Sequence, residues 1–258
     1  MTLPEVRSAL REQATTEQAR IALRFFKTGP GEYGEGDEFL GLKVPQVRAL
    51  VRPCDSLPER DVISLLRSPA HEERLLALLC LVRRFDRGDQ QARQHVFDLY
   101  LKNTRWISNW DLVDTSAPHI VGRWLLDRDR SVLRRLAAST VLWERRIAVL
   151  ATQTFIRHRD FADTLEIVRS LLGDTHDLMH KACGWMLREV GNRVYLSARF
   201  EQQNPHAALC QFLCRPASGC ARPDYDRIVM IAFRHGRRTL LFKIADALVR
   251  RLPYGVEP

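Results

Sequence analysis

An indole and two carboxylates lie close together in the chain at Trp110, Asp111 and Asp114. In a helix, side chains at positions i and i+4 share one face, so Trp110 and Asp114 would project together, with Asp111 about one turn before Asp114. A carboxylate beside an aromatic ring, in an otherwise basic protein, suits a positively charged or cation-forming substrate held against a nucleic acid. A structural interpretation also stays open, in which Trp110 belongs to the core and the aspartates cap a helix.

The composition of the chain is typical of a soluble, basic globular protein. It has 258 residues, of which 45% are hydrophobic and 28% charged, and a formal net charge of +9. Arginine supplies most of the positive charge, and a guanidinium group can bind two phosphate oxygens at once. The charge favours a nucleic acid as the partner, although charge alone does not separate such a protein from one that is merely basic.

The sequence gives no sign of membrane insertion or secretion. No apolar run is long enough to cross a bilayer, and residues 1–11 lack the apolar core of a secretory signal. We therefore expect a cytoplasmic protein that does not bind membranes.

The six cysteines give no sign of a metal site. Three of them lie in apolar helical contexts and are expected to be small buried side chains: Cys54, Cys80 and Cys183. The others cluster without a CxxC pair or a well-spaced histidine: Cys210, Cys214 and Cys220. No metal and no cofactor is expected.

Apolar residues recur at helical spacing along the chain, and strand patterns are scarce. Short turn-forming stretches separate the helical segments, and a first helix is followed by a longer, more apolar second helix. The expected pairs are 57–66 (capped by Ser56) with 68–85, 131–140 with 143–156, and 161–171 with 178–190.

The second helices of these pairs repeat at a fixed interval. Glu73, Asn109, Glu144 and His180 begin similar segments about 36 residues apart. This period predicts one all-α domain over residues 1–258, a HEAT-like or armadillo-type superhelix in which about six helical pairs form a curved solenoid. Equivalent positions on the second helices would line a concave wall carrying Arg, Trp, Asp and Lys side chains.

The segment 29–37 interrupts the helices because it is too rich in glycine. A nucleotide-binding P-loop is not indicated, since no strand precedes the segment and no Lys-Ser or Lys-Thr pair follows it. The loop could contact a DNA backbone or close over a substrate. Val44 and Pro45 are expected to begin the next helix.

Several stretches together resemble the bacterial DNA alkylation-repair family, the AlkD-like DNA glycosylases with HEAT-like repeats. The resemblance covers roughly residues 20–193, whereas 194–258 is atypical and shows a helical pattern again only near 238–244. The stretches, in the family's order, are 24–27, the glycine-rich loop with 39–41, 110–114, 143–146 and 181–189.

The resemblance implies a glycosylase that removes purines alkylated at N3 or N7 from double-stranded DNA as a monomer, without turning the base out of the helix. Asp114 matches the family's essential aspartate, Trp110 and Trp185 its two active-site indoles, and Arg146 its important arginine. Arg188 matches an arginine near the DNA backbone. The further DNA-binding residues expected from the resemblance are Lys43, Arg145, Lys181 and Phe25. Lys43 stands where some relatives have glutamine, and Phe25 lacks a hydroxyl group.

The chemistry of the residues agrees with this implication. A cationic purine is already a good leaving group, so a carboxylate near the sugar suffices to stabilise an oxocarbenium ion and orient water. Asp111 would then be a helix cap or helix contact. Two alternatives remain, a non-catalytic protein that binds distorted or branched DNA, and a protein-interaction scaffold.

Overall fold

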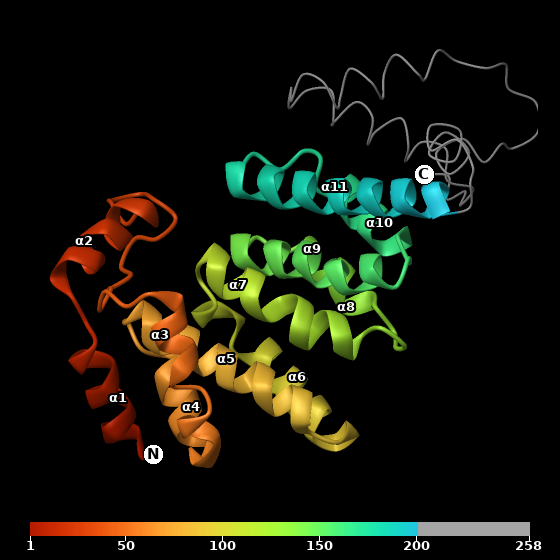
Figure 1. Cartoon of the computed structure of the whole chain (residues 1–258). Coiled ribbons are helices and arrows are strands. Elements are labelled where there is room, and N and C mark those ends of the chain that lie inside the picture. Colours follow the sequence, from red (N-terminus) through yellow and green to blue (C-terminus); the bar gives the residue numbers. More distant parts are fainter. Residues whose placement is uncertain (201–258) are drawn as a thin grey trace, which may run out of the picture. The chain divides into compact units, whose positions relative to one another are not determined.

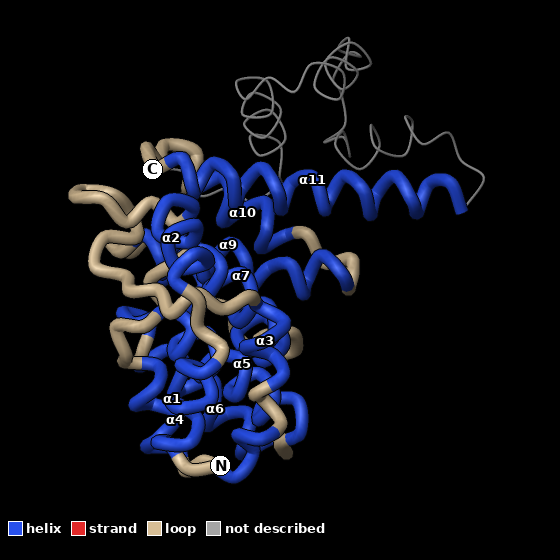
Figure 2. Tube along the Cα trace, turned by 60° about the vertical axis from the view of Figure 1, so that its left-hand side comes forward, coloured by secondary structure: helices blue, strands red, loops and turns tan. Residues whose placement is uncertain are grey.

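The computed structural model describes residues 1–200, and side chains up to residue 194. Every regular element within this range is helical, as the tube in Figure 2 shows, apart from one isolated bridge between Glu38 and Ala70. The prediction of an all-α fold is therefore confirmed for the described part of the chain. The predictions at Cys210, Cys214, Cys220 and 238–244 lie outside the described residues.

The chain divides into two compact units at Asp129 and Arg130. The α-helices of the first unit are α1 (Leu3–Glu12), α2 (Thr16–Phe25), α3 (Val44–Ala49), α4 (Glu59–Leu66), α5 (His71–Arg87), α6 (Gln90–Lys102) and α7 (Trp110–Ala117). Short 3₁₀ turns lie at Pro53–Ser56 and Thr104–Trp106, and α7 continues into a π-helical turn at Pro118–Gly122.

Helix α5 is the centre of the first unit. It packs against α1, α3, α4, α6 and α7, and Leu75–Leu78 are buried. Its composition of Leu, Ala, Glu and Arg favours a helix, with acids in the first turn and arginines in the last that complement the helix dipole. The first four residues of α5, from His71 to Arg74, are buried although all are polar or charged, so each requires a partner.

The described part of the second unit contains α8 (Ser131–Ala137), α9 (Leu142–Arg157), α10 (Ala162–Ser170) and α11 (Asp177–Phe200). Helix α9 is central, since it packs against the other three (Figure 1). The expected pairs are present as α8 with α9 and α10 with α11. The expectation of a single domain over 1–258 remains a prediction.

Several predicted helix ends were wrong by a few residues. Helix α4 begins at Glu59 after Pro58, because Ser56 belongs to the preceding 3₁₀ turn and does not cap the helix. Helix α8 ends at Ala137, where Ser139 engages Val141 N–H and Glu144 through its side chain instead of extending the helix. Other ends differ as follows: α5 spans 71–87, α9 142–157, α10 162–170 and α11 177–200.

The glycine-rich segment 29–37 is a loop, as predicted, and α3 begins at Val44 with Pro45 in its first turn. The prediction that three cysteines are small buried side chains is confirmed. The thiols of Cys54, Cys80 and Cys183 are buried and free. No described helix is both long and apolar enough to span a membrane.

Candidate functional site

Helix α7 has the register that the sequence predicts. It begins at Trp110, whose backbone N–H donates to the side chain of the buried Asn109, 2.8 Å away. Trp110 and Asp114 are therefore one turn apart on one face, and both are half-buried. The half-buried indole of Trp110 both packs against its neighbours and keeps part of its surface exposed.

The negative charge of Asp114 affects a buried tyrosine in the interior of the first unit. The buried hydroxyl of Tyr100 donates to or accepts from Ser116 Oγ on α7 at 2.9 Å. Burial raises the pKa of Tyr100, and the negative charge of Asp114 raises it further. Asp114 thus combines partial exposure with an electrostatic effect on its surroundings, which suits a group that acts on a developing cation.

The indole of Trp110 belongs to an aromatic cluster formed by Phe25, Phe26, Phe39, His71 and Trp110. Phe26 stacks on Trp110 with ring centroids 5.5 Å apart, and Phe25 meets the same indole edge-on at 5.8 Å. Phe26 also stacks on Phe39 at 5.0 Å. Phe25 is 62% exposed, although it contacts the cluster. Helix α2 therefore presents an exposed aromatic side chain beside Trp110.

A buried ionic network lies next to the cluster and consists of Asp37, His71, Arg74, Asn109 and Asp111. Asp37, at the end of the glycine-rich loop, accepts hydrogen bonds from Arg74 at 2.6 Å and from Asn109 at 2.9 Å. His71 faces two carboxylates, with Nε2 2.8 Å from Asp111 and Nδ1 3.3 Å from Asp37. Asp111 is thus a helix contact, as expected, but one that is tied to a histidine on α5.

The ionic network shifts the pKa of two of its members. Burial opposes the charged form of His71, but hydrogen bonds to Asp111 and Asp37 outweigh it and raise the pKa of His71 to about 9. Burial likewise opposes ionisation of Asp37, yet hydrogen bonds from His71 and Asn109 and the charge of Arg74 lower its pKa. At neutral pH the network therefore holds two cations against two carboxylates.

The exit of the glycine-rich loop is also fixed to α5. The carboxylate of Glu72 accepts the backbone N–H groups of Leu40, Gly41 and Leu42 at 2.8 to 3.1 Å. Gly41 has φ +90°, and a Cβ there would lie 2.1 Å from the carbonyl oxygen of Thr15, so only glycine fits. The buried acids and bases at the start of α5 thereby position the loop and, through Asp37, the start of α7.

In the second unit, three predicted residues form one stripe on α11. Lys181, Trp185 and Arg188 follow the i, i+4, i+7 spacing of a helix face. The indole N–H of Trp185 donates to Glu189 at 3.2 Å, and Lys181 pairs with Asp177 at 2.8 Å. Arg188 is exposed, and no hydrogen bond or ion pair joins it to the described residues. Of the predicted arginines, it is the one best placed to bind a phosphate.

The two arginines of α9 are engaged within the second unit. Arg146 is only 4% exposed and donates to the carbonyl oxygen of Leu178 at 2.7 Å. Arg145 binds Asp174 at 2.7 Å and the carbonyl oxygens of Ser139 and Thr140. Both side chains therefore join α9 to neighbouring segments. The sequence shows that both positions carry a guanidinium group, but not that Arg145 pairs with an acid or that Arg146 is buried against a backbone carbonyl.

The predicted residues thus fall into two groups, each within one unit. Phe25, Trp110 and Asp114 come together in the first unit, and Lys43 lies exposed at the start of α3 with its backbone N–H bound to Gln46. The second group spans α9 and α11 in the second unit: Arg145, Arg146, Lys181, Trp185 and Arg188. The residues that sequence reasoning missed are Phe26, Asp37 and His71. Only the type of His71, a titratable residue at a helix start, could have drawn attention to it.

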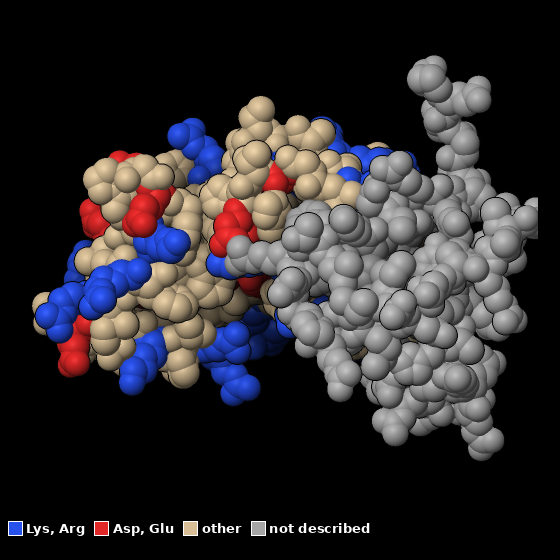
Figure 3. All heavy atoms as spheres, turned by 90° about the horizontal axis from the view of Figure 1, so that it is seen from above, with Lys and Arg blue, Asp and Glu red and all other residues tan. Residues whose placement is uncertain are grey.

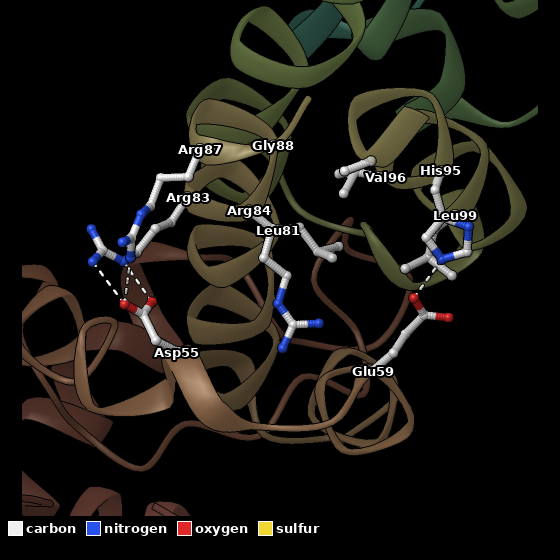
Figure 4. A pocket seen from close by; sticks show the side chains of 11 residues that line it. Asp55, Glu59, Leu81, Arg83, Arg84, Arg87, Gly88, His95, Val96 and Leu99 are labelled. Atoms are coloured by element: carbon white, nitrogen blue, oxygen red, sulfur yellow. Dashed lines mark hydrogen bonds and ion pairs between the residues drawn. The ribbon is translucent and has the colours of Figure 1, made fainter. Parts of the chain in front are cut away.

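The surface does not present one uniform charge. On the face drawn in Figure 3, basic and acidic side chains are interspersed over the described part. A cavity of about 390 Å³ lies between α4, α5 and α6 and is shown in Figure 4. Most of its charged side chains are paired, because Asp55 binds Arg83 and Arg87, and Glu59 binds His95. Arg84 donates to the carbonyl oxygen of Leu57. The cavity includes none of the predicted site residues.

Comparisons with known proteins agree with the fold and with the resemblance. Residues 6–198 match the model of a family described as DNA alkylation repair enzyme. The structure is similar to that of a predicted DNA alkylation repair enzyme from Enterococcus faecalis, with a TM-score of 0.53 and 14% sequence identity, over 79% of this chain and 98% of that chain. At this identity the similarity shows the fold alone. No curated protein gives a significant match.

Proposed function

Because the chain belongs to the DNA alkylation repair enzyme family, we propose that it is a DNA glycosylase that hydrolyses the N-glycosidic bond of purines carrying a cationic N3 or N7 alkyl group in duplex DNA. The observation that carries the proposal is the pairing of Asp114 and Trp110 on one half-buried face of α7. Phosphate binding alone does not call for a carboxylate at such a place, because it would repel the DNA.

Asp114 is the catalytic group in this proposal. The alkylated purine leaves as a neutral base, so no general acid is needed, and positive charge develops on the sugar as the bond breaks. An ionised carboxylate stabilises that charge and accepts a hydrogen bond from the attacking water. The indole face of Trp110, one turn from Asp114 on α7, attracts the same cation through its π-electrons. Trp185 is the indole that the resemblance assigns to the same chemistry. The chemistry of this carboxylate and the indole requires no metal and no cofactor.

The remaining residues hold the DNA or the protein. Arg188 binds a backbone phosphate, since it is exposed and not engaged by the described residues. Lys43 and Lys181 add exposed positive charge, and Phe25 extends the aromatic surface beside Trp110. Arg145 and Arg146 contribute chiefly by fixing α9 to the segments around the start of α11.

A gel assay for abasic sites tests the proposal. A duplex with one 7-methylguanine and a fluorescent end label is incubated with the protein and then heated in alkali, which cleaves abasic sites. The expected result, at an incubation time just long enough for the full chain to cleave the strand, is almost no cleavage with Asp114→Asn. Asp98→Asn is the matched control, because Asp98 is an exposed carboxylate on α6 outside the proposed site. DNA binding without any strand cleavage by the wild-type chain would favour the non-catalytic DNA-binding alternative.

A further inference from the structure

We propose that His71 acts as a positioning residue whose doubly protonated ring holds the first turn of α7 and the Trp110 indole in place, so that base excision has an alkaline limit. The excision part of this inference rests on the proposed function, whereas the protonation state of His71 and its coupling to Trp110 do not. His71 does not touch the proposed substrate position, and its effect passes through Asp111 and the aromatic cluster.

The hydrogen bonds of His71 require both of its ring protons. Nε2 lies 2.8 Å from an oxygen of Asp111, and Nδ1 lies 3.3 Å from an oxygen of Asp37. A carboxylate only accepts hydrogen bonds, so a neutral imidazole would satisfy one partner and set a bare lone pair against the other. The side chain of His71 is 3% exposed, and water cannot readily replace the missing bond.

A second connection joins His71 to the same part of α7. Its ring stacks on Phe39 at 4.6 Å and lies 4.9 Å from Phe26, which in turn stacks on Trp110. Asp111, the hydrogen-bond partner of His71, is the next residue after Trp110. The indole is thus held through ring contacts on one side and through its own backbone on the other, and both connections begin at His71.

The charges around His71 balance only when its ring is a cation. Asp37 faces it from the glycine-rich loop, Asp111 from α7 and Arg74 from α5, while Asn109 is the neutral partner of Asp37. Two cations therefore oppose two carboxylates in a buried site. Loss of the His71 proton would leave one carboxylate uncompensated there, which is strongly unfavourable in a region of low polarity.

The direction of the pH dependence follows from this balance. The ordinary histidine pKa is 6.5, and in the folded protein it is raised to about 9. Stabilisation from His71 is therefore complete below about pH 6.5 and is lost as the pH rises through about 9. Below about pH 9 the hydrogen bond from His71 on α5 to Asp111 is intact. Above about pH 9 this hydrogen bond is lost and the first turn of α7 loosens.

Nuclear magnetic resonance of the full chain tests the protonation state and the coupling without any reference to catalysis. The imidazole nitrogens of His71, assigned by comparison with His71→Gln, are expected to be both protonated at pH 8 and to titrate near pH 9. The ring ¹H–¹³C signals of Trp110 should move with the same midpoint in the wild type and stay fixed in His71→Gln. A His71 midpoint near 6.5, or Trp110 signals that ignore the titration, would overturn the inference.

Single-turnover excision of 7-methylguanine tests the effect on the proposed reaction. His71→Gln should lower the rate constant at pH 8 by about 10-fold to 10²-fold, the scale of a small misplacement in an active site, with Kd for the duplex unchanged within about twofold. Between pH 8 and 10 the wild-type rate should fall, whereas the low rate of the variant should stay flat; incubations without enzyme correct for alkaline damage to the base.

A control variant shows whether the effect is specific to His71, and the two possible negative results lead to different conclusions. His95→Gln removes an exposed histidine that pairs with Glu59 on α4, and it should retain the wild-type rate and pH profile. A His71→Gln variant that matches the wild type in rate and in pH profile would refute the positioning role. If the wild type excises no base at any pH, the proposed function fails, and the magnetic resonance experiment still decides whether a charged His71 positions Trp110.

Discussion

Replacement of Asp114 by asparagine isolates the charge that the proposed chemistry needs. The two side chains have nearly the same shape, and Asp114 is half-buried on a helix whose start is fixed by Asn109 and Asp111. The substitution should therefore leave α7 intact. What disappears is a full negative charge beside the sugar on which positive charge develops.

The size of the effect follows from Coulomb's law. For two unit charges about 4 Å apart in a partly buried site, an effective dielectric constant of about 20 gives about 4 kcal/mol. Each 1.4 kcal/mol or so of barrier changes the rate about tenfold, so the upper limit is about 10³-fold. Because the sugar is only partly cationic in the transition state, we expect Asp114→Asn to slow excision by about 10²-fold to 10³-fold.

The assay is single-turnover excision of 7-methylguanine with the protein in excess, together with the Kd for the same duplex. Binding should be unchanged or tighter, since the carboxylate repels phosphates until the cation forms. The control Asp98→Asn changes the same charge on the exposed face of α6 and should be silent. Excision by Asp114→Asn at the wild-type rate, with normal binding, would refute the catalytic assignment.

Three further predictions concern the DNA surface and the parts that hold α7. Arg188→Ala should weaken binding to damaged and undamaged duplex alike and reduce the log–log salt slope by about 1, whereas Arg135→Ala, at an exposed position on α8, should leave the slope unchanged. Asp111→Asn should lower the free energy of unfolding by about 3 kcal/mol in denaturant titrations at pH 7, because His71 loses a buried counter-charge; unchanged stability would contradict the ionic network. Gly41→Ala should destabilise the protein more than Gly36→Ala in thermal unfolding, since both glycines have positive φ but only a Cβ at 41 meets a backbone oxygen, at 2.1 Å; equal losses would contradict the close approach.

The sequence predicted α7 well because its signals are local. Trp110 and Asp114 share a face through the helical repeat alone, and the glycine-rich loop is recognisable from composition. The same reasoning expected Asp111 to be a helix cap or a helix contact. Its actual partner is His71 on α5. The sequence could not identify this partner, because the two residues are 40 positions apart and no local pattern links them.

The expected basic wall illustrates a second limit of sequence reasoning. Equivalent positions on the second helices were expected to line a concave wall with Arg, Trp, Asp and Lys side chains. Arg74 instead binds Asp37, and Arg145 binds Asp174, while Arg146 is buried against a backbone carbonyl. Residue type and helical phase indicate which face a cation occupies, but its compensation by an acid from a distant loop depends on tertiary packing. Because Arg74, Arg145 and Arg146 are engaged within the protein, the exposed Arg188 is the better arginine for testing DNA binding.

Release of the free base is the most direct test of the account. Duplex DNA containing 7-methylguanine is incubated with the protein, and the small-molecule fraction and the DNA are analysed separately by mass spectrometry. A glycosylase releases intact 7-methylguanine and leaves an equal amount of abasic sites, and this is the expected result. Restoration of guanine within the DNA, or recovery of unchanged 7-methylguanine in the strand under conditions where the protein binds the duplex, would contradict the account.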